Sequence, residues 1–387
     1  MNGPNDFYVG REQTYIKHVF LRRYLETLAV KIMMGGWGAF NYVDGFAGPW
    51  NIRDDQGCSD ASFGVAVELL EVVRKFVEER RGGKLKLRFC LCEKDPESER
   101  RLREYAAGKS GIEIHVFGGA FEDNLEGIAQ RLPDGYTFTF IDPTNWVVRV
   151  SEVCDFLMER GGDFLFNFMT EEVARHSVNP KVAHQFGEFV GDPDWERTAQ
   201  QLPDDMRGDL KVLHLLKDAF RSRGVANYLP DFSILKNGVN REKMRLMLGT
   251  RRPEGVKVFR DVHAKVEQEE FKIRREAKAF LTGQGMLFTS EYFASYEQGE
   301  RGVGCKRYLD LAEERISEIL AREHAIDFGT LALLLMEQFP LKETHVKDVC
   351  SRMKARGLLD FQLEGKARKP SDDTLITAPQ GTDEGLF

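Results

Sequence analysis

The sequence has no excess of positive charge and no long hydrophobic run. Its 387 residues contain 55 Lys and Arg against 62 Asp and Glu, which gives a net charge of −7 at pH 7. This balance argues against a protein coated with basic residues for non-specific nucleic-acid binding. No apolar run reaches the roughly 18 residues of a membrane-spanning helix, and no signal-peptide pattern is present. We therefore expect a cytoplasmic protein without a membrane partner.

Paired cysteines and internal repeats are missing as well. The cysteines are Cys58, Cys90, Cys92, Cys154, Cys305 and Cys350. They lack the paired spacing of metal ligands, so the sequence predicts no metal site. Cys90 and Cys92 alternate along an apolar segment and share one face of a strand, which favours buried core thiols.

Two segments depart from the acidic average. Residues 241–280 hold 12 Lys and Arg against 7 Asp and Glu, and residues 341–370 hold 8 against 4. With 42% hydrophobic residues at this length, the chain can bury a large core, and we expect two or three structural units.

Short apolar runs alternate with helical patterns between residues 40 and 170. This alternation is typical of right-handed βαβ units and predicts an α/β fold with a doubly wound, Rossmann-like sheet. Parallel strands are expected at Phe40–Phe46, Leu87–Cys92, Glu113–Phe117, Tyr136–Ile141 and Phe164–Met169. Apolar residues at helical spacing from Phe63 to Val77 predict the first crossover helix, with Ser59 or Asp60 as its N-cap.

The pattern changes along the rest of the chain. A helical insertion is expected at about residues 171–225, and two closing strands complete a sheet domain that spans residues 1–265. The charged helix that follows has mixed signs and suits a solvated connector, residues 266–304. Residues 305–370 predict three short helices and a basic hairpin, and residues 371–387 are expected to form a disordered tail.

Carboxylates and glycines gather where the expected strands end. The strand tips contain, in chain order, Asp44-Gly45-Phe46-Ala47-Gly48, Glu93-Lys94-Asp95, Gly118-Gly119-Ala120-Phe121-Glu122-Asp123 and Asp142-Pro143. In an open parallel sheet, ligands bind beyond the carboxyl ends of the strands, so we expect these residues to meet at one site. Each also has a structural alternative, because Gly48 can belong to a plain turn and Glu93 can cap the next helix.

The loop after the first strand favours one kind of ligand. Gly45 and Gly48 let the backbone approach a ligand closely, and an acidic residue at Glu93 can accept both hydroxyls of a ribose. The loop lacks the G-x-G-x-x-G fingerprint that a dinucleotide pyrophosphate requires. A nucleoside without phosphates does not require it, which points to S-adenosylmethionine as the cofactor.

Several segments also carry a family likeness: YVDGFAGPW, FIDPTNW, FLFNFM and TYIKHVFLRRYLETL. They resemble the three-Cys-motif partner proteins, a bacterial family with a class I methyltransferase-like fold. The likeness covers about residues 10–260, and DGFAGP is its most specific part. The cysteines of the family name belong to the partner protein, so the resemblance implies a three-Cys-motif protein as a partner and gives this chain's cysteines no role.

A more distant likeness concerns the segments QTYIKHVFL and IDP, which are similar to the ribosomal-RNA adenine N6-methyltransferases. It implies that Gln13 and Lys17 reach the methionine end of the cofactor, with Lys17 near the carboxylate. The expected cofactor site therefore comprises Gln13, Lys17, Asp44, Gly45, Phe46, Gly48, Glu93, Lys94, Phe121 and Asp142.

Asp142 and Pro143 carry the expected chemistry. An exocyclic adenine amine is a poor nucleophile, and a site that methylates it needs acceptors for two N–H groups. In the D-P-P-Y pattern of that family, the Asp side chain and a proline carbonyl accept them while the aromatic ring stacks on an extruded base. Here Thr144 replaces the second proline, and Trp146 follows Asn145 one position late. The candidate catalytic residues are Asp142, Pro143, Asn145 and Trp146; the alternative is a strand-ending turn with Trp146 covering the core.

The basic carboxy-terminal region resembles a winged helix, with residues 342–356 in the recognition position. Contacts to phosphates would come first in such a module. The candidate nucleic-acid-binding residues are Lys342, Lys347, Arg356, Lys366, Arg368 and Lys369. Winged helices also dock proteins, so a protein-binding role stays open.

Two functions follow from these patterns. The first is an S-adenosylmethionine-dependent methyltransferase that acts on DNA or RNA at an exocyclic amine of a base. The second is a non-catalytic subunit that binds the cofactor or a nucleic acid for a partner enzyme. A Trp146 ring that faces the crevice favours catalysis, and a ring buried in the core favours the binding role. A cofactor-free nuclease is disfavoured, because no metal-ligand pair with an adjacent lysine stands out.

Overall fold

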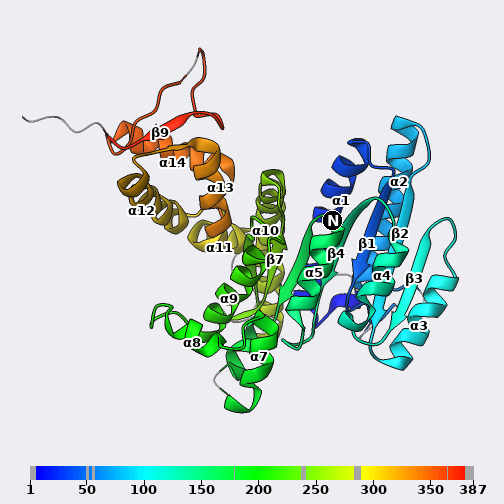
Figure 1. Ribbon diagram of the computed structural model, residues 1–387. Coiled ribbons are helices and arrows are strands. Elements are labelled where there is room, and N and C mark those ends of the chain that lie inside the picture. The colour runs from blue at the N-terminus through cyan, green and yellow to red at the C-terminus, as the bar shows by residue number, and fades with distance from the viewer. Residues whose placement is uncertain are drawn as a thin grey trace, which may run out of the picture. The chain divides into compact units, whose positions relative to one another are not determined.

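The computed structural model describes residues 6–48, 52–54, 57–177, 179–236, 241–282, 289–363 and 365–379. The chain divides into two compact units (Figure 1). Unit 1 comprises Met1–Val258 with Phe280–Thr282, and unit 2 comprises Phe259–Ala279 with Gly283–Phe387. Each unit is described by itself.

Unit 1 is built on a seven-stranded sheet in the order β3-β2-β1-β4-β5-β7-β6. The strands are β1 Ala39–Asp44, β2 Lys86–Glu93, β3 Glu113–Gly118, β4 Tyr136–Ile141, β5 Phe164–Phe168, β6 Asp231–Leu235 and β7 Glu242–Gly249. The first five strands run parallel, and β7 is antiparallel to both of its neighbours. The expected α/β fold class is confirmed: the sheet is doubly wound and Rossmann-like, with parallel strands in its first five positions along the chain.

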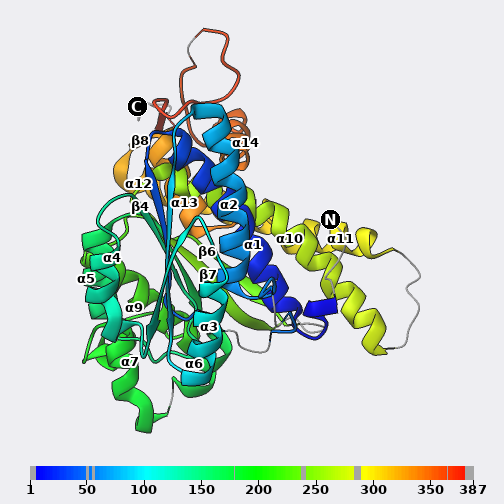
Figure 2. The ribbon, with the colours of Figure 1, turned by 90° about the vertical axis from the view of Figure 1, so that its right-hand side faces the viewer.

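Helices cover both faces of the sheet. Figure 2 shows α1, α2 and α3 on one face and α4 and α5 on the other. The helices of unit 1 are α1 Glu12–Met34, α2 Ser62–Arg81, α3 Pro96–Ala107, α4 Leu125–Arg131, α5 Val150–Arg160, α6 Thr170–His176, α7 Ala183–Val190, α8 Trp195–Gln200 and α9 Gly208–Ser222. Short 3-10 turns form at Asp6–Tyr8, Glu122–Asn124 and Pro180–Val182. Because both faces are covered, the central strands are almost continuously apolar.

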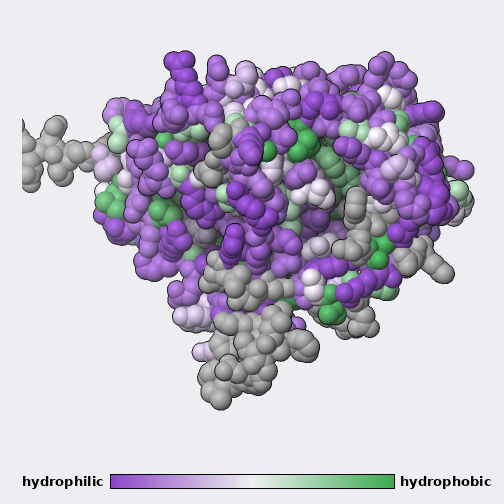
Figure 3. Space-filling view, turned by 90° about the horizontal axis from the view of Figure 1, so that it is seen from below, coloured by the Kyte–Doolittle hydropathy of each residue, from purple (hydrophilic) through white to green (hydrophobic). Residues whose placement is uncertain are grey.

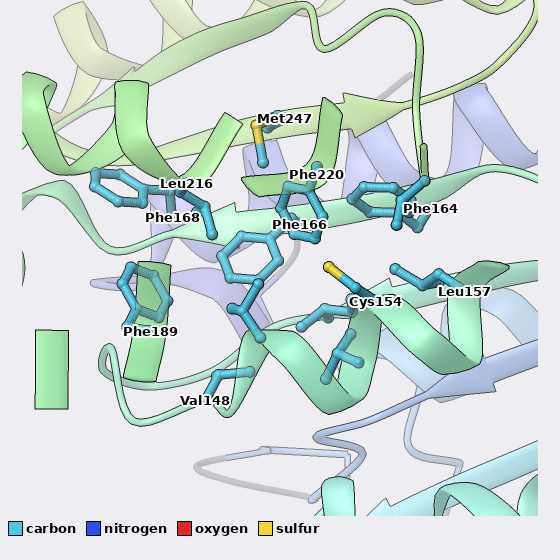
Figure 4. Close-up of a cluster of buried hydrophobic side chains, with 14 of the residues drawn as sticks. Val148, Cys154, Leu157, Phe164, Phe166, Phe168, Phe189, Leu216, Phe220 and Met247 are labelled. Atoms are coloured by element: carbon cyan, nitrogen blue, oxygen red, sulfur yellow. The ribbon is translucent and has the colours of Figure 1, made fainter. Parts of the chain in front are cut away.

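The apolar residues of β5 show how the sheet and the inserted helices are held together. Phe164, Phe166 and Phe168 alternate along the strand and point to the same face, where they meet Phe220 of α9 and Phe189 of α7 (Figure 4). The ring centroids of Phe164 and Phe220 are 4.9 Å apart, and those of Phe166 and Phe189 are 6.1 Å apart. Each buried ring of this size contributes on the order of 1.5–3 kcal/mol of hydrophobic stabilisation.

Two local predictions have clear outcomes. All six cysteines are buried and unpaired, which confirms core thiols. The N-cap prediction for α2 is wrong, because Ala61 occupies that position. Asp60 instead accepts hydrogen bonds from the Arg11 guanidinium at 2.8 Å and from the Arg53 backbone N–H at 2.9 Å.

Unit 2 is mainly helical. Its elements are most of α10 Pro253–Thr282, then α11 Ser290–Arg301, α12 Lys306–Glu323, β8 Ala325–Asp327, α13 Phe328–Gln338, α14 Glu343–Ala355 and β9 Leu375–Thr377. β8 and β9 pair antiparallel, and Asp360 forms a further bridge to Thr377. β9 lies within the segment that was expected to be a disordered tail; residues 380–387 of that segment lie outside the described residues.

The charged helix α10 is not a solvated connector, although its mixed charges suggested one. Within the predicted connector, residues 266–304, Glu267 and Glu270 are only 8% and 3% exposed, and the Glu267 carboxylate accepts the Val303 N–H at 2.6 Å. Arg260, earlier in α10, is only 1% exposed. The Arg260 guanidinium donates to the backbone carbonyls of Met336 at 2.6 Å and Glu337 at 3.1 Å. Charge periodicity in the sequence cannot reveal such partners, because they lie far along the chain.

The surface of the molecule is polar on the face drawn in Figure 3, where hydrophobic residues form small, separate patches. Within the described ranges, no helix combines the length and the apolar character needed to cross a membrane.

Candidate functional site

A cavity of about 850 Å³ lies at the carboxyl ends of the parallel strands of unit 1. This is the edge at which open α/β sheets bind ligands. The predicted residues that line it are Gln13, Lys17, Gly45, Phe46, Gly48, Glu93, Lys94, Phe121, Asp142, Pro143 and Asn145. Asp44 and Trp146 are not among its lining residues.

Glu93 ends β2 with its carboxylate in a fixed orientation. The side chain is almost fully buried, with 4% of the residue exposed, and its Oε1 accepts the backbone N–H of Asp95 at 2.6 Å. Asp95, not Glu93, is the N-cap of α3 and accepts the Ser98 N–H at 2.8 Å. Glu93 is therefore an oriented carboxylate in the cavity wall, and the helix cap is a separate residue.

Gly45 is required by packing against the protein itself. A Cβ at this position would lie 2.8 Å from two ring carbons of Phe121. Gly45 was expected to leave space for a ligand, but the Phe121 ring occupies the space next to its Cα. Phe121 is fully buried and packs between Phe46 and Phe156.

Asp44 lies beneath the cavity floor and supports the loop that forms it. Its carboxylate is fully buried and accepts hydrogen bonds from the Ser62 hydroxyl at 2.8 Å, the Phe46 N–H at 3.1 Å and the Tyr42 hydroxyl at 3.2 Å. Burial raises the pKa of Asp44 to about 7, and these hydrogen bonds oppose part of the increase. Asp44 thus joins the end of β1 to the start of α2.

Asp142, at the end of β4, is held from both sides. The Lys17 ammonium forms an ion pair with Oδ2, and the Asn167 side-chain amide donates to Oδ1 at 2.6 Å. The Asp142 side chain keeps 14% of its surface exposed to the cavity region. A carboxylate can accept about four hydrogen bonds, so both oxygens retain acceptor capacity beyond these two contacts.

Asn167 was not predicted as a site residue. It sits on β5 in the segment FLFNFM, is 1% exposed and lines the cavity. A polar residue within an otherwise apolar buried strand needs a partner, and this rule could have identified it. Glu122, from the tip of the third strand, does belong to the site: it is buried, lines the cavity and accepts the Arg149 N–H at 2.8 Å.

Trp146 lies in the core and does not face the crevice. Only 7% of the residue is exposed, and its ring stacks on Phe186 at 5.0 Å between centroids with an interplanar angle of 13°. The extra residue Asn145 forms a local turn, in which its Oδ1 accepts the Val147 N–H at 2.9 Å. The apolar ring is turned inward, and the exposed position after it belongs to Val147.

The far wall of the cavity comes from elements that no motif identified. Gln185 and Glu188 of α7 and Lys243 and Met244 of β7 line it. These residues have no local pattern, because the insertion and the last strand reach the site only through the completed sheet.

The predicted nucleic-acid-binding residues of unit 2 lie on α14, at its two caps Lys342 and Arg356, and on the segment between Asp360 and β9. Four of the six form ion pairs: Lys342 with Asp261, Lys347 with Glu343, Arg356 with Glu313 and Lys369 with Asp348. Lys366 and Arg368 are exposed, and no ion pair is recorded for either within the described residues. Much of the local basic excess is therefore neutralised inside the unit.

Comparisons with known proteins give weak likenesses only. No protein-family model matches the chain, and no curated protein matches its sequence. LPL1258 of Legionella pneumophila, of the family DUF519, is 12% identical over 64% of this chain and 89% of its own, with a TM-score of 0.35. A suspected O-methyltransferase from Klebsiella pneumoniae is 13% identical over 64% and 92%, with a TM-score of 0.32. Cofactor-bound Rv0187 from MTB is 12% identical over 60% and 79%, with a TM-score of 0.29. Scores this low do not support conclusions about function.

Proposed function

We propose that unit 1 binds S-adenosylmethionine at the carboxyl edge of its sheet and transfers the methyl group to an exocyclic amine of a nucleic-acid base. The observation that carries the proposal is Glu93, a buried and oriented carboxylate in the wall of the 850 Å³ cavity at the end of β2. An acidic residue at this position in a Rossmann-like sheet accepts ribose hydroxyls.

The cavity also suits the rest of such a cofactor. Its volume is within the range of about 300–1,000 Å³ that small-molecule sites occupy. Glu93 would hold the ribose, and Gln13 and Lys17, by the family resemblance, would hold the methionine end. When bound, the cofactor supplies an electrophilic methyl group.

Asp142 is the candidate acceptor for the substrate amine. Its charge is compensated by Lys17, and its orientation is held by Asn167. The amine N–H is far too weak an acid for a carboxylate to remove beforehand, so Asp142 acts by accepting a hydrogen bond. The carbonyl of Pro143 is the second acceptor, and the Asp142-Pro143 pair is the part of the site that supports a base amine as substrate.

A second function is favoured by one specific observation, the burial of Trp146 in the core. Without an aromatic ring in the crevice, an extruded base loses the stacking contact of the D-P-P-Y pattern. The chain would then be a non-catalytic subunit that binds the cofactor or a nucleic acid for a partner enzyme, such as a three-Cys-motif protein.

One pair of measurements separates the two functions. Calorimetry with S-adenosylmethionine reports cofactor binding, and single-turnover transfer of labelled methyl to mixed DNA and RNA reports catalysis. For a methyltransferase, Asp142→Ala should lower the transfer rate by about 10²–10³ and leave cofactor affinity largely intact. Asp142→Asn should retain more activity, because its amide oxygen still accepts a hydrogen bond.

The remaining outcomes are equally informative. Transfer that persists undiminished in Asp142→Ala removes Asp142 from this role. Cofactor binding without transfer to any polymer assigns the non-catalytic function, and the absence of cofactor binding rejects the proposal as a whole.

A further inference from the structure

A second cavity, of about 460 Å³, lies at the amino ends of β4 and β5 in unit 1, opposite the carboxyl ends that line the first cavity. It is lined by the end of α1, the residues before β4 and β5, and the turn from β7 into α10. β4 has six residues, so its amino and carboxyl ends, where the two cavities lie, are separated by about 20 Å. Among the described residues, the two cavities share no lining residue.

Aromatic rings form one wall of this second cavity. Trp37 follows Gly36, whose φ of +110° is accessible to glycine, and 43% of Trp37 is exposed. Its ring meets the edge of Tyr136 at 5.9 Å with an interplanar angle of 79°, so Tyr136 supports it from one side. A supported tryptophan with an exposed face is a platform on which a planar ligand ring can stack.

Cations line the same cavity. Lys31 and Arg252 are exposed, and no ion pair or hydrogen bond of either side chain is recorded within the described residues. Arg251 differs, because its guanidinium donates to the Val225 carbonyl at 3.1 Å and contacts the Met158 sulfur at 3.0 Å. Lys31 and Arg252 are thus available to an anionic ligand, whereas Arg251 is engaged in the fold.

Two acidic residues also line the cavity. Asp163 is buried and accepts the Tyr24 hydroxyl at 3.1 Å; burial raises the pKa of its carboxyl, and the charge of the nearby Arg252 opposes part of that increase. Glu254 is exposed to solvent, which screens its charge. The cavity therefore combines an aromatic platform with two available cations.

We propose that this second cavity binds a nucleotide, with the base stacked on Trp37 and the phosphate held by Lys31 and Arg252. An uncharged aromatic ligand would leave the two cations unused, and inorganic phosphate would leave the aromatic platform unused. The nucleotide can be a free mononucleotide or one residue of a single strand, since both present a base and a phosphate.

The test uses the tryptophan fluorescence of the full chain. Titration with 5′-AMP, adenosine, inorganic phosphate and a single-stranded oligonucleotide should show quenching by a phosphate-bearing nucleotide, with AMP or the oligonucleotide binding about tenfold or more tightly than adenosine. Trp37→Phe should remove the quenching. Lys31→Glu with Arg252→Glu should weaken binding by at least about tenfold, and Arg100→Glu, an exposed arginine on α3, is the matched control.

Each outcome decides a point. Quenching by both AMP and the oligonucleotide supports a free nucleotide or a strand end, and quenching by the oligonucleotide alone assigns a strand. Equal binding of adenosine and AMP, unchanged affinity in the double reversal, or no quenching by either nucleotide overturns the proposal. Displacement of AMP by S-adenosylmethionine, or loss of AMP binding in Glu93→Ala, would place AMP in the first cavity and also overturn it. The test does not depend on methyl transfer, so it stands if the proposed function fails.

Discussion

Glu93 shows how a single residue in the cavity wall is prepared for a ligand. Its desolvation on β2 and its hydrogen bond from the Asp95 N–H fix the carboxylate before any ligand arrives. A group that is held in place loses little conformational entropy on binding, so its contacts contribute more fully to affinity.

We predict that Glu93→Ala weakens S-adenosylmethionine binding by about 1–3 kcal/mol, the usual cost of leaving buried hydroxyls without a partner. Isothermal calorimetry measures the change. Glu97→Ala, on the exposed first turn of α3, is the matched control and should bind like the wild type. An unchanged affinity in a folded Glu93→Ala protein would remove Glu93 from the site.

Asp44 makes the stability of unit 1 depend on pH. Its pKa is about 7 in the folded protein against 3.8 for an ordinary Asp, so between these values only the unfolded chain ionises. The contribution of Asp44 to folding is fully present below about pH 4, falls by roughly 4 kcal/mol as the pH rises to 7, and is constant above that.

We predict that Asp44→Asn removes this part of the pH dependence, because an amide does not titrate. Its oxygen can replace Oδ1 as the acceptor of the Phe46 N–H, and its NH₂ group can donate to the hydroxyl oxygens of Ser62 and Tyr42. Urea unfolding of wild type and variant between pH 5 and pH 8 measures it. Asp123→Asn, at an exposed carboxylate, should keep the wild-type slope. Equal slopes in Asp44→Asn and wild type would contradict the assignment.

At the scale of elements, the loop after β1 and the segment before α4 are locked together by the contact of Gly45 with Phe121. We predict that Gly45→Ala destabilises the protein by about 1–3 kcal/mol, because the new Cβ overlaps the ring at 2.8 Å. Gly38→Ala, just before β1, has no heavy atom within 4 Å of its new Cβ and should be tolerated. Thermal unfolding compares them, and a double variant with Phe121→Leu should recover part of the loss; without such recovery, the clash is not the cause.

Lys366 and Arg368, in the segment between Asp360 and β9, show no ion pair within the described residues, whereas Lys369 in the same segment is paired with Asp348. We predict that neutralising Lys366 and Arg368 with Gln lowers nucleic-acid affinity and flattens its salt dependence, because these side chains can meet phosphates without breaking an ion pair. Neutralising Lys347 and Arg356, which are paired with Glu343 and Glu313, should have a smaller effect. Filter binding across a salt series measures both. Identical slopes in all proteins would favour a protein-docking role for this region.

The elements also show what can be predicted from the sequence. β1 to β5 were expected within two residues of their observed bounds, because the central strands are buried on both faces and read as largely apolar runs; β3, at the edge of the sheet, is less buried but keeps a short apolar pattern. The residues at or just after the ends of these strands were expected to meet at one site, and Glu93, Phe121 and Asp142 do line one cavity. One interpretation placed the Trp146 ring in the crevice, whereas the ring lies in the core. Trp146 comes one position later than the aromatic residue of the D-P-P-Y pattern, and the sequence pattern does not show to which side such a shifted side chain points.

At the scale of the whole molecule, the division into two units predicts separate unfolding. Phe166→Ala removes a core ring from unit 1 and should lower the stability of that unit by about 3–5 kcal/mol. Leu331→Ala, in the core of α13, should lower that of unit 2 by about 2–5 kcal/mol. Scanning calorimetry should show each change in a different transition. A shift of both transitions by either change would indicate that the chain unfolds as one cooperative structure.

The wall that β7 gives to the first cavity has a consequence for synthesis of the protein. Lys243 and Met244 face the same space as Gln13 and Lys17, although most of unit 1 separates them in sequence. On the ribosome, the cavity is complete only after β7 has emerged and inserted beside β5. A ligand of this cavity therefore cannot assist the early steps of folding; it can only stabilise a sheet that is already finished.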